Sequence, residues 1–171
     1  MNNSENFNPY YLRLPGKFDQ IKLASSIHKF RENFQKYHKP CILELAPEIA
    51  DCVTSIRWIL KHSYIGNYSN LLASQNLRIG SIPKVLIQSQ EIQIIQSPQN
   101  GDLLFCGNET RAISHLAMYI NQKHFHVQQD NLSHFDDIEE ITSKYKIPSL
   151  NELETYTDHR SLNFQNNTLQ I

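Results

Sequence analysis

The stretch Ser114-His115-Leu116-Ala117-Met118-Tyr119-Ile120 has the period of two that is typical of a β-strand. His115 lies on the more polar face of this strand. The other face is apolar and is formed by Leu116, Met118 and Ile120. Asn121-Gln122 then fits a hairpin turn, and residues 123–128 fit a partner strand. We expect the hairpin to bring His126 within reach of His115.

A further strand and two helices complete the predicted core. Residues 102–106 leave a turn at Gly101 as a strand. A first helix, ended by Pro40, is predicted from apolar residues at three- and four-residue steps: Phe18, Ile21, Ala24, Ile27, Phe30, Phe34 and Tyr37. A second helix, with Pro47 in its first turn, is predicted from the apolar face Ile49, Cys52, Val53, Ile56, Ile59 and Leu60. These patterns predict an α+β fold with N-terminal helices packed on a central antiparallel β-sheet.

The rest of the chain predicts one domain with short flanking segments. Residues 1–16 are expected to be a loosely ordered N-terminal arm, 17–165 a single domain and 166–171 a tail. Residues 66–80 are predicted to be loop-like, with a possible short helix. Within the domain, further strands are predicted at 85–87, 92–95 and 160–164, and helices at 136–145 and 150–156.

Composition limits the kinds of partner. The chain has 171 residues and a net charge of −1, so no excess of positive charge steers it toward nucleic acid or an anionic membrane. Three cysteines without Cys-x-x-Cys spacing favour neither a disulfide framework nor a metal site. The N-terminus lacks a basic segment followed by an apolar core. We therefore expect a cytoplasmic protein or one exported by a signal-independent route, and its oligomeric state stays open.

Asp51-Cys52 at the predicted start of a helix indicates thiol chemistry. At a helix start, the helix dipole lowers the pKa of a thiol and favours the thiolate. A thiol in the middle of a helix would instead be an inert packing residue. The position of Cys52 therefore depends on whether the helix starts at Glu48 or at Asp51, which the sequence leaves open. His115 is the candidate base. The residue that orients its imidazole is one of His126, Gln128 and Asn131.

Four blocks in this order resemble the NlpC-type peptidoglycan endopeptidases, a branch of the papain-like cysteine peptidases. They are Asp51-Cys52, the strand from Gly101 to Phe105, the strand that begins near His115, and the strand that carries His126, and the match covers about residues 45–128. Cys52 and His115 are 63 positions apart, and His115 and His126 are 11 apart, close to the usual family spacing.

The chain departs from the family at two places beside the cysteine. Val53-Thr54 stands where the family usually has Ser-Gly, and residues 39–44 lack the usual Pro-Tyr-x-x-Gly-Gly. In the family these positions shape the subsite for a free peptide amine. The departures predict a tighter, more apolar wall beside Cys52. They also predict either weaker selection for a free L-Ala terminus than in typical members of the family or cleavage of a different amide.

The resemblance implies a peptide or muropeptide substrate, cleaved at an amide of the D-glutamyl-diaminopimelate type, without a cofactor or a metal. It implies that Cys52 is the nucleophile, His115 the base and His126 the orienting residue, with Asp51 and Ser114 in contact with substrate. Three alternatives stay open: a catalytically silent binding module of the same fold, a delivered effector acting on a non-peptidoglycan amide, and a zinc site built from His124, His126 and a cysteine.

Overall fold

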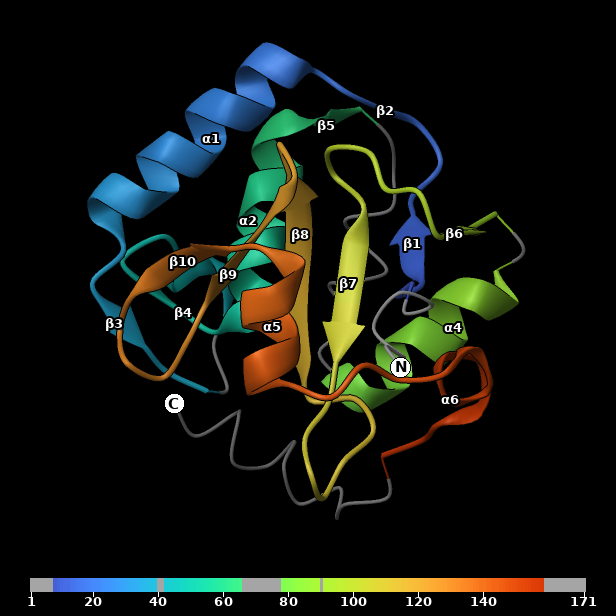
Figure 1. Cartoon of the computed structure of the whole chain (residues 1–171). Coiled ribbons are helices and arrows are strands. Elements are labelled where there is room, and N and C mark those ends of the chain that lie inside the picture. Colours follow the sequence, from blue (N-terminus) through green and yellow to red (C-terminus); the bar gives the residue numbers. More distant parts are fainter. Residues whose placement is uncertain (1–7, 40–41, 66–77, 90, 159–171) are drawn as a thin grey trace.

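A computed structural model describes residues 8–39, 42–65, 78–89 and 91–158 (Figure 1). A six-stranded antiparallel sheet in the order β10-β9-β8-β7-β1-β6 forms its centre. The strands are β1 (Tyr11–Arg13), β6 (Gln93–Ile95), β7 (Leu103–Cys106), β8 (His115–Ile120), β9 (Lys123–Val127) and β10 (Ser133–Asp136). The predicted antiparallel sheet and α+β class are confirmed.

The turn between β8 and β9 is the predicted one. Asn121 and Gln122 have φ angles of 49° and 70°, and positive φ at both central residues matches the twist of a tight hairpin. The turn fixes the register in which Met118 lies opposite Phe125. Since successive side chains point to opposite faces, this register places both catalytic candidates, His115 and His126, on the same face of the sheet.

Helices cover both faces of the sheet (Figure 1). On one face, α1 (Gln20–Asn33) and α2 (Cys52–Ser63) bury apolar side chains against alternate strand residues such as Leu103 and Phe105. On the other face, α5 (Ile138–Lys144) packs through Ile141 on Leu104 and Cys106. Leu103 and Phe105 thus face the opposite way from Leu104 and Cys106, as the alternation of a strand requires.

Shorter elements complete the described fold. They are β2 (Lys17–Phe18), β3 (Lys36–Tyr37), β4 (Ile49–Ala50), β5 (Tyr64–Ile65), α4 (Ile82–Gln88) and α6 (Leu150–Thr155), with 3-10 turns at Leu43–Leu45 and Ile79–Ser81. The predicted helix at 150–156 and the strand at 92–95 are confirmed. The predicted strand at 160–164, the tail, and most of the loop at 66–80 lie outside the described residues.

The prediction of a loose N-terminal arm is wrong for the residues that form β1. This strand lies inside the sheet, between β6 and β7, and Leu12 is fully buried. Tyr11 is also buried, and its hydroxyl hydrogen-bonds His124 at 2.8 Å. Three residues are too few to show a strand period, so only the tertiary pairing reveals this strand.

Two other predictions of secondary structure are wrong. Residues 85–87 belong to the helix α4, whose first turn accepts Pro83 because no intrahelical N–H bond is needed there. The first helix ends at Asn33, earlier than predicted, and Ile21 is 83% exposed because the buried face is formed by Leu23, Ser26, Ile27 and Phe30.

Candidate active site

The nucleophile candidate stands at the first residue of a helix. α2 begins at Cys52, and Asp51 caps it, since its Oδ1 accepts a hydrogen bond from the backbone N–H of Thr54 at 2.7 Å. The parallel pair of β3 and β4 leads into this cap and sets Tyr37 opposite Ala50. Of the two helix starts left open, Glu48 and Asp51, the structure has the later one, so the prediction that Pro47 lies in the first turn of this helix is wrong, and Ile49 lies in β4 instead. The backbone N–H of Cys52 belongs to the first turn, where helix N–H groups have no intrahelical partner.

Burial nevertheless dominates the acidity of the thiol. Cys52 is 2% exposed, and desolvation followed by the charge of Asp51 raises the pKa of its thiol to about 12. Lys39 and the backbone N–H groups of Leu116 and Val53 lower the pKa by smaller amounts. The thiol is thus protonated at neutral pH, contrary to the expectation that the helix dipole would favour the thiolate.

Leu116, whose backbone N–H lowers the pKa of the thiol, is the second residue of β8 and directly follows His115. Among the hydrogen bonds of the described residues, none joins the thiol directly to His115. The Nε2 atom of His115 lies 2.9 Å from Nδ1 of His126. The ring also stacks on Tyr145, with the centroids 4.3 Å apart and the planes 5° from parallel.

The series of hydrogen bonds continues beyond His126. Its Nε2 lies 2.9 Å from Oδ2 of Asp136, which accepts a hydrogen bond from Nζ of Lys144 at 2.8 Å. Burial alone would raise the pKa of Asp136, but the hydrogen bonds from Lys144 and His126 hold it below its ordinary value. Asp136 is therefore ionised at neutral pH and can only accept hydrogen bonds.

An ionised Asp136 fixes the tautomers of both histidines. Burial lowers the pKa of His126 to about 4, so this ring is neutral and carries its single proton on Nε2, facing the carboxylate. Its Nδ1 then accepts, which requires the proton of His115 to lie on Nε2. Burial, followed by the neighbouring His126, lowers the pKa of His115 well below its ordinary value. His115 is left with a bare Nδ1, the form that a general base needs.

Of the three candidates for the orienting residue, only His126 contacts His115. The side chain of Gln128 accepts a hydrogen bond from Lys144 at 3.0 Å, and that of Asn131 accepts one from the backbone N–H of Tyr37 at 2.8 Å. Sequence reasoning missed Asp136, which was assigned to a helix, and Tyr37, which was assigned to helix packing. The spacing from His126 to Asp136 would have suggested a strand pair only if β10 had been recognised.

A pocket of about 260 Å³ opens beside His115, and we call it the His115 pocket. His115 and Tyr145 line one part of it, and Ser114, one of the predicted substrate contacts, also lines it. Cys52 and Asp51 are not among its lining residues, and Asp51 is occupied as a helix cap.

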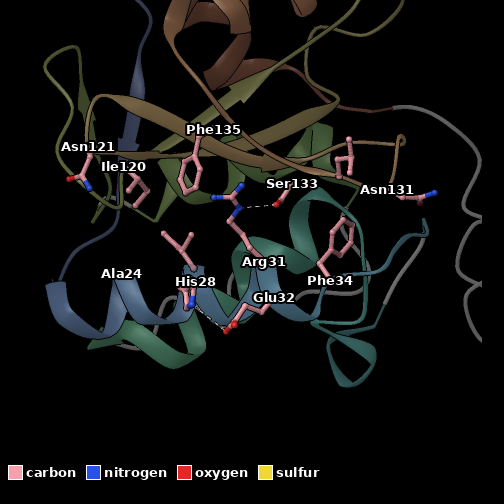
Figure 2. A pocket seen from close by; sticks show the side chains of 12 residues that line it. Ala24, His28, Arg31, Glu32, Phe34, Ile120, Asn121, Asn131, Ser133 and Phe135 are labelled. Atoms are coloured by element: carbon pink, nitrogen blue, oxygen red, sulfur yellow. Dashed lines mark hydrogen bonds and ion pairs between the residues drawn. The ribbon is translucent and has the colours of Figure 1, made fainter.

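The predicted apolar wall beside Cys52 is not a wall of this pocket. Neither Val53 nor Thr54 lines it, because Thr54 is buried and Val53 packs against the core. A larger groove of about 620 Å³, which we call the α1 groove, lies between α1 and β10 (Figure 2). None of the histidines and cysteines of the candidate active site lines this groove.

The described residues contain no group of three or more His, Cys, Asp and Glu arranged to hold a metal ion. Of the residues considered for a zinc site, His124 has both ring nitrogens in hydrogen bonds. Its Nδ1 donates to the Asp136 carbonyl at 3.0 Å, and its Nε2 accepts from the Tyr11 hydroxyl at 2.8 Å. No helix in the described ranges is long and apolar enough to cross a membrane.

Comparison with known proteins agrees with this geometry at the level of the family. No curated protein matches the chain. A model of the NlpC/P60 family matches residues 46–153, which span more than half of the chain and include all the residues of the hydrogen-bonded series. Members of this family are in general cysteine peptidases or amidases of the papain-like class. The chain belongs to the NlpC/P60 family.

Proposed function

We propose that this protein is a cysteine hydrolase that cleaves an amide bond, with Cys52 as nucleophile and His115 as general base. The hydrogen-bonded series Asp136-His126-His115 is the observation that carries the proposal, because it leaves Nδ1 of His115 bare as a proton acceptor. His115 is the first residue of β8 and precedes Leu116, whose backbone N–H acts on the Cys52 thiol. A cysteine at the start of a helix and an acceptor of fixed tautomer are the two groups that nucleophilic catalysis requires.

The proton must move during attack, because the resting thiol is not ionised. In the proposed reaction Nδ1 of His115 takes the proton of Cys52 as the sulfur bonds to the amide carbon. The tetrahedral intermediate then collapses, and His115 gives the proton to the departing amine. Water, deprotonated by His115, hydrolyses the thioester, which releases the acid and restores the thiol.

Two groups could stabilise the oxyanion of the intermediate. The backbone N–H of Cys52 belongs to the first turn of α2, where helix N–H groups have no intrahelical partner. The phenol of Tyr37 lines the His115 pocket and is close enough to Cys52 for that residue's charge to raise its pKa, after the larger effect of burial. Tyr37 therefore stays protonated and can donate.

Family resemblance extends the proposal to a substrate. It points to a peptidoglycan stem peptide cut at the D-glutamyl-diaminopimelate bond, and a delivered effector acting on another amide is a variant of the same chemistry. The test is hydrolysis of defined muropeptides by the wild type and by Cys52→Ala, followed by mass spectrometry. Cys106→Ala is the matched control, since it removes the other described buried thiol, on the α5 face of the sheet.

We expect cleavage by the wild type and by Cys106→Ala, and none by Cys52→Ala. Cleavage that survives in Cys52→Ala would refute Cys52 as nucleophile. If wild-type protein cleaves neither muropeptides nor a panel of other peptide amides, the hydrolase proposal fails.

A binding module without activity is the second candidate, and one observation favours it. Cys52 is 2% exposed and does not line the His115 pocket, so a substrate in that pocket has no open path to the sulfur without movement of neighbouring side chains. Thiol alkylation does not separate the two candidates, because a pKa of about 12 predicts slow alkylation near neutral pH for both. Turnover separates them.

A further inference from the structure

The His115 pocket carries positive charge without a compensating acid. Arg111 and Lys39 line it, and none of its described lining residues is Asp or Glu. The protein as a whole has a net charge of −1, so this is a local concentration of cations and not a general property of the surface. The α1 groove differs, since Glu32 accompanies Arg31 there (Figure 2).

Arg111 is presented by a rigid turn immediately before β8. The side-chain oxygen of Asn108 accepts hydrogen bonds from the backbone N–H groups of Thr110 and Arg111, both at 2.9 Å. The backbone N–H of Asn108 also donates to the carbonyl of Arg111 at 2.8 Å. Gly107 lets this turn fold back, because a Cβ at that position would overlap the backbone of Ala112. The backbone of Arg111 is thus ordered before any ligand binds, which lowers the entropic cost of binding.

The guanidinium of Arg111 is incompletely satisfied. Its Nη1 atom is buried and has no hydrogen-bond partner among the described residues. Two other cations of the protein have a carboxylate as partner. Arg13 donates two hydrogen bonds to Asp102, and Lys144 donates one to Asp136. A buried N–H group of a charged side chain without a partner is costly, and an arriving acceptor would remove that cost.

Lys39 supplies the second charge from the segment after β3. Its ammonium is close enough to the catalytic candidates to lower the pKa values of both Cys52 and His115, although burial is the larger influence on each. Arg111 in turn opposes the rise in the pKa of Tyr37 that burial causes. Lys39 therefore acts on the thiol and the base, and Arg111 acts on Tyr37, which lines the same pocket.

We propose that the His115 pocket binds a carboxylate of the substrate, with Arg111 as its hydrogen-bonding partner and Lys39 as a second cation. The planar guanidinium fits a carboxylate with two parallel hydrogen bonds, and the cations repel an amine. The inference rests on the proposed function, since it assigns the pocket to the substrate. It also agrees with the weaker selection for a free amine expected from the sequence. The cause differs, since the amine is repelled by the cations of the pocket and not excluded by an apolar wall beside Cys52.

Binding measurements test the proposal without requiring turnover. The probes are two tripeptides, L-Ala-γ-D-Glu-diaminopimelate with a free α-carboxylate on the glutamyl residue and the same peptide with a carboxamide there. Their dissociation constants are measured by isothermal titration calorimetry on Cys52→Ala protein. We expect the acid to bind about ten- to a hundredfold more tightly than the amide, as hydrogen bonds between charged groups allow.

Variants then assign the preference to the pocket. Arg111→Gln in the same background should remove most of the preference, Lys39→Gln part of it, and Arg111→Lys should retain part of it because the charge remains. Arg31→Gln is the matched control, because it removes a cation from the α1 groove, and it should leave the preference unchanged.

Equal affinity for the two peptides, no measurable binding of the acid, or a preference that persists in Arg111→Gln would overturn the proposal. The proposed function fails separately: a clear preference for the acid in a protein whose wild type cleaves neither peptide would indicate a carboxylate-binding module. If both peptides are cleaved and bind with equal affinity, the proposed hydrolase function stands and the proposed carboxylate site is refuted.

Discussion

Acid should destabilise the folded protein through His126. Burial holds the pKa of this residue at about 4 in the folded state, against about 6.5 in an unfolded chain. Between these values the unfolded chain binds a proton that the folded protein does not bind, so the equilibrium moves toward unfolding as the pH falls. The stabilisation is complete above about pH 6.5 and is lost as the pH falls toward 4.

The magnitude follows from the difference between the two pKa values. A difference of about 2.5 pH units corresponds to roughly 3.4 kcal/mol in the limit, and at about pH 4.5 to a loss of roughly 2.5 kcal/mol. His115 and His124 shift in the same direction and add to the loss. Asp136 contributes only at lower pH, because its pKa is held below its ordinary value.

Urea unfolding at about pH 7.5 and about pH 4.5, followed through the fluorescence of Trp58, measures this loss. Trp58 is the single tryptophan and is 6% exposed, so unfolding changes its surroundings. His126→Gln should be less stable than wild type at the higher pH and lose about 2 kcal/mol less between the two values. His28→Gln is the control, since His28 is exposed, and it should keep the wild-type dependence. The same loss in wild type and His126→Gln would refute the assignment of a neutral, buried His126.

Three further outcomes are expected. His115→Ala should abolish hydrolysis, and His126→Ala should reduce it less, because a base is indispensable while an orienting group fixes the tautomer and the rotamer; full activity in His126→Ala would contradict the series. Asp136→Asn should lower kcat by about tenfold or more and change its pH profile, because an amide can donate to His126 and impose the wrong tautomer; an unchanged pH profile would argue for a purely structural role. Gly107→Ala should destabilise the protein by about 3 kcal/mol in urea unfolding, because the new methyl group would overlap the backbone of Ala112, and a loss below about 1 kcal/mol would show that the turn can relax.

Periodicity predicted the parts of the fold that are long enough to repeat. β8 and β9 alternate over several residues and are joined by a turn of suitable residues, so the hairpin and the pairing of His115 with His126 could be predicted from sequence. β1 and β3 have three and two residues, and their places are determined by pairing: β1 pairs with β6 and β7, far along the chain, and β3 pairs with the equally short β4. No local pattern specifies such pairings.

The acidity of Cys52 shows a different limit of sequence reasoning. The sequence left two starts for this helix, Glu48 and Asp51, and only the second gives Cys52 the observed place in the first turn. The effect of a helix start on a thiol has a known sign. The depth of burial depends on how α2 packs against the sheet, and it outweighs the helix and the nearby cation. A local pattern therefore offered the observed position of the thiol as one of two, and it gave the wrong direction for the shift of the thiol pKa.

The pair Asp136-Asp137 explains why the carboxylate of the site could not be found in the sequence. Acidic residues are expected at the start of a helix, and Asp137 has this role: its side chain accepts from the backbone N–H of Glu140 at 2.8 Å, in a capping box. Asp136, one position earlier, is the last residue of β10, lies opposite His124 in the register and reaches His126, the diagonal neighbour two positions along β9. One helix signal accounted for both aspartates, although the backbone changes from strand to helix between them. The residue that sets the tautomers of both histidines thus becomes visible only when β10 is paired with β9.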